Sequence, residues 1–174
     1  MISNRFVPPY RRGMIARDRR QSCGFTLVEL MIALAVVAIL SAIAYPMYTN
    51  QLIKAQRVEA RTALMRAAQL LERRFTQEAS YPADTKGFNA LYSLAEGASI
   101  YSNPDQPTSA ERSKFRITYT AGTPPAAGLA PLSYTLTATP QANARPDANC
   151  GNFRLNERGQ RSTTGTDPRG ECWR

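Results

Sequence analysis

The sequence contains no histidine among its 174 residues, and none of its serines lies in a Gly-x-Ser-x-Gly turn. Histidine is the commonest general base in enzymes and a frequent ligand of zinc. Serine and threonine are plentiful, but nothing in the sequence would activate their hydroxyl groups as nucleophiles. We therefore expect no enzyme active site, no metal site and no cofactor.

Charged residues are missing from one long stretch. From Leu30 to Ile53 there are 24 consecutive uncharged residues. About 20 predominantly apolar residues let a helix cross the hydrocarbon core of a bilayer. Pro46 lies late in this stretch, where it should bend the helix or loosen its hydrogen bonds. We expect residues 25–50 to form a transmembrane or assembly helix.

Positive charge is concentrated before this stretch. Residues 1–24 hold six arginines and one acidic residue, a net charge of +5, whereas the rest of the chain carries +4. Basic residues ahead of an apolar helix hold that end on the cytoplasmic side of the membrane. Residues 1–24 are therefore interpreted as a leader outside the fold, and Met14 is a second possible start that would shorten it. The basic N-terminus is a topology signal and only a weak indication of nucleic-acid binding.

Glycine and proline are absent from residues 50–78, where the helix should continue in amphipathic form. Apolar side chains recur there with a helical period of 3.6 on one face, comprising Ile53, Ala60, Leu64, Ala68, Leu71 and Phe75. We expect this face to pack on a sheet as core, and the helix to end before Tyr81-Pro82.

The rest of the chain alternates between loops and short strands. Residues 79–112 are rich in proline and glycine, with a short helix expected around 89–95. Residues 114–120 and 133–139 alternate as strands do, and 152–156 with 160–164 predict a final hairpin. The fold class is α+β, in which a long N-terminal helix packs on an antiparallel sheet of about four strands. Residues 51–174 would form this head domain.

The junction between the leader and the apolar helix reads Cys-Gly-Phe-Thr-Leu-Val-Glu-Leu, residues 23–30. An ordinary secretory signal is cleaved after its apolar core, but the plausible processing site here precedes that core. Glu29 also lies inside the apolar helix, and a carboxylate there costs about 2.5–3.5 kcal/mol on insertion scales. A simple single-pass anchor gives no reason for that cost.

Together with Pro46 and the amphipathic extension, this junction resembles the N-terminal signature of type IV pilins. The resemblance implies the type IV pilin fold, and a prepilin peptidase that cleaves after Gly24 and methylates the new amine of Phe25. It also implies that Glu29 pairs with the N-terminal amine of a neighbouring subunit, which neutralises a buried charge. Pro46 corresponds to the helix-breaking proline of that family.

The C-terminal segment, from Cys150-Gly-Asn-Phe to Glu-Cys172-Trp173, carries a second resemblance. It is similar to the ending of PilE-like minor pilins, a branch related to the competence pilin ComP. Removal of the leader would take Cys23 away and leave Cys150 and Cys172 to form a disulfide in an oxidising compartment. A bridge closing a loop of about 20 residues stabilises by roughly 3 kcal/mol.

The same segment holds candidate DNA contacts, because arginine contacts to phosphates dominate nucleic-acid affinity. The candidates are Arg154, Arg158, Arg161 and Trp173. Six arginines accompany four acidic residues in the last 30 positions. A solvated hairpin of mixed charge is therefore preferred, with any DNA affinity weak and nonspecific.

Three functions stay open. A structural minor subunit of a type IV pilus, serving adhesion, twitching motility or DNA uptake, is favoured over a pilus-displayed DNA receptor and over a type II secretion pseudopilin. The resemblance implies other pilin subunits, the prepilin peptidase, an inner-membrane assembly platform and membrane lipid as partners, with DNA added in the receptor alternative. It places the chain in the inner membrane before assembly, with the leader cytoplasmic and the head periplasmic, and in the surface pilus afterwards.

Overall fold

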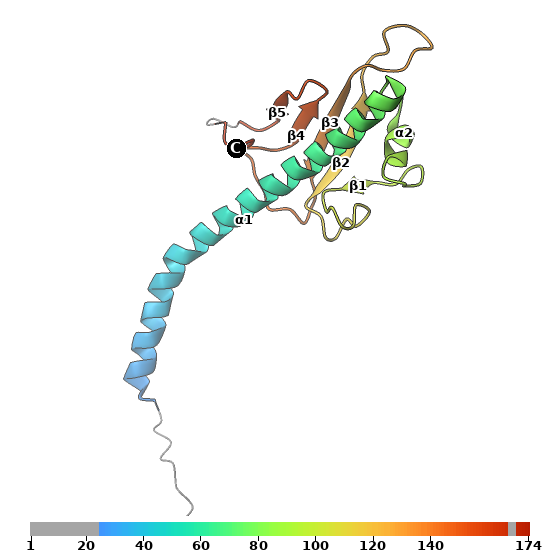
Figure 1. Ribbon diagram of the computed structural model, residues 1–174. Helices are drawn as coiled ribbons and strands as arrows, with labels where there is room; N and C mark the ends of the chain where they lie inside the picture. Colours follow the sequence, from blue (N-terminus) through green and yellow to red (C-terminus); the bar gives the residue numbers. More distant parts are fainter. Residues whose placement is uncertain (1–24, 167–169) are drawn as a thin grey trace, which may run out of the picture. The chain divides into compact units, whose positions relative to one another are not determined.

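A computed structural model describes residues 25–166 and 170–174, and the expected leader, with the cleavage site expected after Gly24, lies outside these residues. The chain divides into two compact units between Ala42 and Ile43. One helix, α1 (Leu27–Glu78), contributes to both (Figure 1). It ends before Tyr81-Pro82, as predicted.

The start of α1 is set by a capping threonine. The Glu29 backbone N–H donates to the Thr26 hydroxyl at 3.2 Å, and the Leu30 N–H donates to the Thr26 carbonyl at 3.2 Å. Thr26 and Glu29 therefore have the spacing of a capping box, in which the carboxylate also lies near the positive end of the helix dipole. This local role of Glu29 was not predicted.

The head half of α1 packs on the sheet through a narrow face with a period of 3.6, as predicted. Its buried residues are Ala60, Ala63, Leu64, Ala67 and Leu71. Ala68 and Phe75, also expected on this face, are partly buried against the core. The alanines have short side chains, so they let the helix approach the strands closely.

Five antiparallel strands form the sheet, in the order β1-β2-β3-β4-β5. They are β1 (Ile100–Tyr101), β2 (Phe115–Ala121), β3 (Tyr134–Pro140), β4 (Phe153–Asn156) and β5 (Arg161–Thr163). The alternation of buried and exposed residues along β2 and β3 follows the period of a strand. The inward side chains complete the core under α1, among them Phe115, Ile117, Tyr119, Tyr134, Leu136, Phe153 and Leu155.

Two predicted features differ in the structure. The sheet has one more strand than expected, because β1 has only two residues and lies within the predicted loop region. The short helix α2 (Thr85–Ala90) begins earlier than the predicted 89–95, because the Asp84 side chain caps it by accepting the Gly87 N–H at 2.8 Å.

The last segment of the head is closed by the predicted disulfide between Cys150 and Cys172, which joins positions 22 residues apart. Both cysteines are buried. Gly165 returns the chain to this bridge, with its N–H donating to the Cys150 carbonyl at 3.0 Å. A side chain at Gly165 would collide with the Asn149 backbone, so this turn requires glycine.

Candidate functional site

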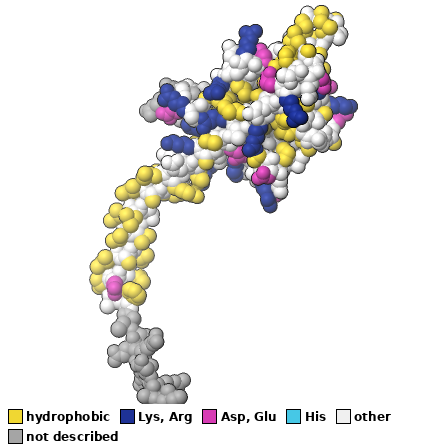
Figure 2. All heavy atoms as spheres, viewed as in Figure 1, with side chains coloured by type: hydrophobic (Ala, Val, Ile, Leu, Met, Phe, Trp, Pro, Cys, Tyr) yellow, Lys and Arg dark blue, Asp and Glu magenta, His cyan; other side chains and the backbone are white. Residues whose placement is uncertain are grey.

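The first unit of the chain exposes an apolar helical surface. Described residues 25–42 are all exposed, and Phe25 is 80% exposed. Yellow side chains cover this part of α1 in Figure 2. The described chain has one helix long and apolar enough to cross a membrane, with a mean hydropathy of 2.7 over its most apolar window and none of that window buried. A helix that is apolar all round needs a membrane or other helices around it.

Pro46 lies inside α1, and the helix is assigned without interruption through it. Proline has no N–H, so it cannot donate to the carbonyl of Ala42 as an ordinary residue would. The Thr49 hydroxyl donates a hydrogen bond to the Pro46 carbonyl at 2.9 Å, so this carbonyl oxygen has a side-chain donor. The helix thus continues through Pro46, which lacks the N–H that would bond the Ala42 carbonyl.

The candidate DNA contacts lie on the β4–β5 hairpin, but on different sides of it. Arg154 pairs with Ser162 across the hairpin, while Arg161 pairs with the buried Leu155. Because paired residues share a face and successive residues alternate, Arg154 and Arg161 point to opposite faces of the sheet. Arg158 lies in the turn between them, with its side chain 77% exposed. The four candidates therefore do not form one flat patch.

Trp173 packs beneath this hairpin. Its ring lies edge-on to Phe153 with centroids 5.7 Å apart, and the Arg161 guanidinium carbon lies 5.6 Å from the centre of the indole. The indole N–H donates to the Ser162 carbonyl at 3.2 Å. Because its polar atom is already bonded and its face meets Arg161, Trp173 supports the hairpin beside the disulfide.

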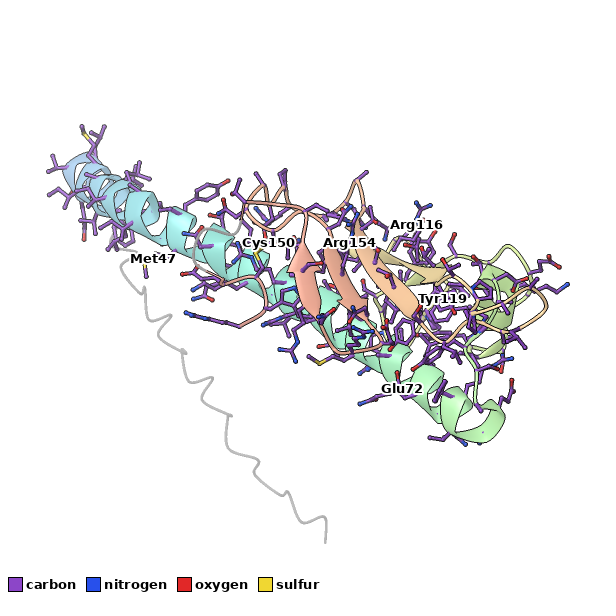
Figure 3. The ribbon with its side chains drawn as sticks, turned by 90° about the horizontal axis from the view of Figure 1, so that it is seen from above. Met47, Glu72, Arg116, Tyr119, Cys150 and Arg154 are labelled. Carbon is purple, nitrogen blue, oxygen red and sulfur yellow. A yellow bond between two sulfur atoms is a disulfide. The ribbon has the colours of Figure 1, made fainter. Side chains whose placement is uncertain are left out.

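The opposite face of the sheet is polar. Arg116 lies opposite Thr139, and Thr137 lies opposite Arg154, so two arginines flank a central strand of threonines. Both arginines are exposed and are labelled in Figure 3. This face offers cations and hydroxyls without a large apolar side chain among its outward residues on β2 and β3.

A further group of cations comes from α1 and was missed in the sequence. Lys54, Arg57 and Arg61 lie on one face of the helix, three and four residues apart. Arg57 donates two hydrogen bonds to the Asp147 carboxylate, from Nε to Oδ2 at 2.7 Å and from Nη2 to Oδ1 at 3.1 Å. This partly buried ion pair ties the helix to the loop before Cys150. Only the folded chain reveals it, since 90 positions separate the partners.

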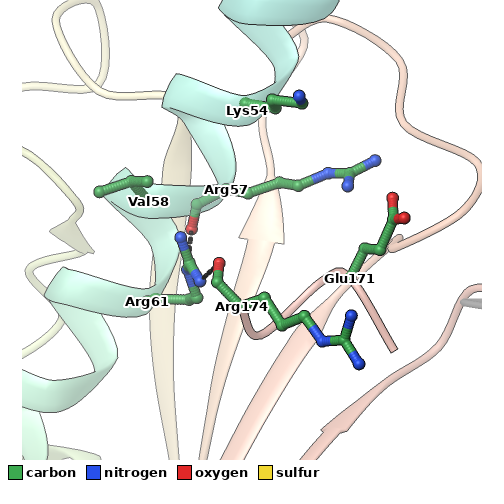
Figure 4. A pocket seen from close by; sticks show the side chains of 6 residues that line it. All are labelled: Lys54, Arg57, Val58, Arg61, Glu171 and Arg174. Carbon is green, nitrogen blue, oxygen red and sulfur yellow. Dashed lines mark hydrogen bonds between the residues drawn. The ribbon is translucent and has the colours of Figure 1, made fainter. Parts of the chain in front are cut away.

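These cations line a cavity of about 410 Å³ between α1 and the end of the described chain. Its lining comprises Lys54, Arg57, Val58, Arg61, Glu171 and Arg174 (Figure 4). Arg61 donates to the carbonyl oxygens of Arg57 and Arg174. Burial, together with the charges of Arg161 and Arg57, lowers the pKa of Arg61. Repulsion from Arg161 and Arg57 thus adds to the larger effect of burial.

Two carboxylates on α1, those of Glu59 and Glu72, accept hydrogen bonds from residues of the strands and loops that pack against the helix. Glu59 accepts hydrogen bonds from the Ser102 hydroxyl and, at 2.9 Å, from the Lys114 N–H. Glu72 accepts from the hydroxyls of Tyr81 and Tyr134 at 3.0 and 3.1 Å. These acids join α1 to the strands and have a structural role. Among the residues that the structure describes, no group of three metal-ligating side chains occurs.

Two family models match the sequence. A prokaryotic N-terminal methylation motif matches residues 19–45, and the family described as "Type IV minor pilin ComP, DNA uptake sequence receptor" matches residues 46–154, more than half of the chain. The chain belongs to this ComP family. It is thus a type IV pilin with an apolar N-terminal helix.

Several fimbrial proteins resemble the ComP-family chain over short segments. The type IV major fimbrial protein FimA of Dichelobacter nodosus is 51% identical over 47 residues, covering 26% of this chain and 30% of FimA. The fimbrial protein EcpB of Eikenella corrodens is 58% identical over 33 residues, covering 19% of this chain and 21% of EcpB. The chain thus spans less than a third of the length of these relatives. A type IV pilin structure from Shewanella oneidensis matches with a TM-score of 0.41 and 24% identity, covering 70% of this chain and 98% of that one.

Proposed function

We propose that this chain is a minor type IV pilus subunit that binds a short DNA sequence during DNA uptake. The observation that carries the proposal is the match of residues 46–154 to the family described as a DNA uptake sequence receptor. It favours the receptor alternative over a purely structural subunit. It also favours a pilus over a secretion pseudopilus, because the matched family is a pilin of the pilus.

The β4–β5 hairpin is the proposed DNA contact. It lies at the edge of the sheet, with Arg154 on one face, Arg161 on the other and Arg158 in the turn. The major groove of B-DNA admits a two-stranded ribbon. A hairpin with cations on both faces and at its tip can therefore contact the phosphates on both walls of the groove. Trp173 would stiffen the hairpin from below rather than stack on a base.

Processing and assembly follow the pilin pattern in this proposal. The peptidase cleaves between Gly24 and Phe25 and methylates the Phe25 amine. Glu29 then pairs with the amine of a neighbouring subunit in the filament. Before assembly the leader end is cytoplasmic and the head periplasmic, as the leader charge of +5 favours. The inner-membrane assembly platform is the remaining partner.

Salt-dependent DNA binding tests the hairpin proposal. The full-length protein in detergent is titrated against fluorescent duplex DNA at several salt concentrations. Each lost phosphate contact lowers the slope of log affinity against log salt by about 0.9. The triple variant Arg154→Gln, Arg158→Gln, Arg161→Gln should therefore lose about 2.7 from the slope. A matched triple change at the exposed Arg66, Arg73 and Arg112 should leave it unaltered, and equal losses in both variants would refute the assignment.

A further inference from the structure

The turn of the β4–β5 hairpin is held together by Asn156. Its backbone carbonyl accepts the Gly159 N–H at 3.0 Å, and its N–H donates to the Gln160 carbonyl at 3.2 Å. Its side-chain oxygen Oδ1 accepts the backbone N–H groups of Arg158 at 3.2 Å and of Gln160 at 2.9 Å. Gly159 has a φ of 70°, a conformation that favours glycine. Four hydrogen bonds thus fix the shape of the turn.

These bonds also determine the orientation of the Gln160 side-chain amide. Two backbone N–H groups donate to Asn156 Oδ1, so that atom is the amide oxygen and the other is the amino group Nδ2. Asn156 Nδ2 lies 2.7 Å from Oε1 of Gln160. An amino group needs an acceptor, so the Gln160 atom that faces it is the amide oxygen. The Gln160 amino group Nε2 is therefore on the side of the amide away from Asn156.

The two N–H donors of Gln160 Nε2 are available to a ligand. Gln160 is exposed, and within residues 25–166 and 170–174 no group accepts a hydrogen bond from Nε2. The neighbouring Glu157 carboxylate pairs with Arg158 Nε at 3.4 Å, and its side chain is only 18% exposed. The folded turn thus presents an oriented amide whose oxygen is engaged and whose donors are open to solvent.

Gln160 lies on the same face of the hairpin as Arg154. Arg154 pairs with Ser162 across the hairpin, and the same register places Gln160 opposite Asn156. Residues two apart on a strand share a face, so Arg154 and Gln160 are diagonal neighbours, about 7–8 Å apart. This separation is comparable to the depth of the major groove of B-DNA, about 8.5 Å. Arg154 can therefore contact a phosphate at the rim of the groove while Gln160 reaches a base edge.

We propose that Gln160 reads a guanine in the DNA that the hairpin binds, an inference that rests on the proposed receptor function. Glutamine commonly reads adenine, with its oxygen accepting from N6 and its amino group donating to N7. Here Asn156 engages the oxygen, so only the donors remain. Guanine presents two acceptors in the major groove, N7 and O6, whereas adenine and cytosine each present an amino group. An amide that can only donate therefore selects guanine.

Selection from a random duplex DNA pool by the full-length protein in detergent, read by sequencing, tests this assignment. A good base contact discriminates by about 5- to 150-fold, so Gln160→Ala should lose a guanine preference of about tenfold at one position of the selected motif. Gln160→Glu keeps an oxygen for Asn156 but replaces the donors by an acceptor, so selection there should change to cytosine or adenine. Gln69→Glu, with the same charge change at an exposed position of α1, is the matched control and should keep the guanine.

The outcomes separate this inference from the receptor function. If the native protein selects a motif and both Gln160 variants select the same one, the role of Gln160 is wrong and the receptor function stands. If the native protein selects no motif, both are wrong. A damaged turn would weaken selection at every position alike, so uniform weakening in both variants, without a change of base, also overturns the inference. Loss of the guanine in the Gln69→Glu control would do the same.

Discussion

Removing the disulfide should cost the head a large share of its stability. The bridge closes a loop between Cys150 and Cys172, which are 22 positions apart. The chain-entropy relation gives about 3 kcal/mol for a loop of this length. A small domain has a total stability of only about 5–15 kcal/mol, so the loss is severe. Both cysteines are buried, so Cys150→Ala with Cys172→Ala avoids the added cost of burying two serine hydroxyls without partners.

The chain carries its own reporter for this loss. Trp173 is the single tryptophan, and it lies next to Cys172 against Phe153. Urea unfolding of the full-length protein in detergent, followed by tryptophan fluorescence, should show an unfolding free energy lower by about 3 kcal/mol. The unfolding free energy of the Cys150→Ser, Cys172→Ser variant should be lower still. If the unfolding free energy of the alanine variant fell by less than about 1 kcal/mol, the disulfide would not be a major source of the head's stability.

Three more outcomes are expected. Intact-mass measurement of membranes should find a mature chain that begins at N-methylated Phe25, and a species retaining Gly24 would contradict the cleavage site. The Glu29→Ala variant should accumulate as processed protein but be missing from sheared filaments. The Glu29→Gln variant removes the charge but keeps a side chain that can cap the helix, so it tests the charge alone. Normal incorporation of both variants into filaments would exclude the assembly role. Burial raises the pKa of Tyr81 and Tyr119 to about 12 from the ordinary value near 10. The fold favours the neutral form of both tyrosines, so their contribution to the unfolding free energy should be fully present below pH 10 and fall as the pH rises toward 12. Equal urea midpoints at pH 9 and pH 11.5 would contradict this.

Periodic segments of the fold were predictable from the sequence. The alternation of Phe115, Ile117 and Tyr119 marks β2, and the 3.6 period through Leu64 and Leu71 marks the packed face of α1. Elements too short to show a period were missed or misplaced. The two-residue β1 depends on pairing with β2, and α2 begins where Asp84 caps it.

The site was only partly predictable, because tertiary folding decides which cations meet. The disulfide followed from the C-terminal resemblance and is present. Arg154 and Arg161 lie on opposite faces of the hairpin because successive strand residues alternate, a consequence that the sequence analysis did not draw. Arg57 with Asp147, and Arg61 with Arg174, depend on how the chain returns to α1, which no local pattern in the sequence encodes.

In the proposed function, this ComP-family pilin recognises a particular DNA sequence. The direct measurement enriches a random duplex pool on the full-length protein in detergent, then compares the affinity of the enriched duplex with that of its shuffled counterpart at physiological salt. Specific protein–DNA complexes typically bind their site at least 10³-fold more tightly than other DNA. We expect the enriched duplex to bind more tightly by a factor of that order. The triple variant Arg154→Gln, Arg158→Gln, Arg161→Gln should lose this preference. Equal affinity for the enriched and shuffled duplexes would contradict the receptor function and leave a structural pilus subunit.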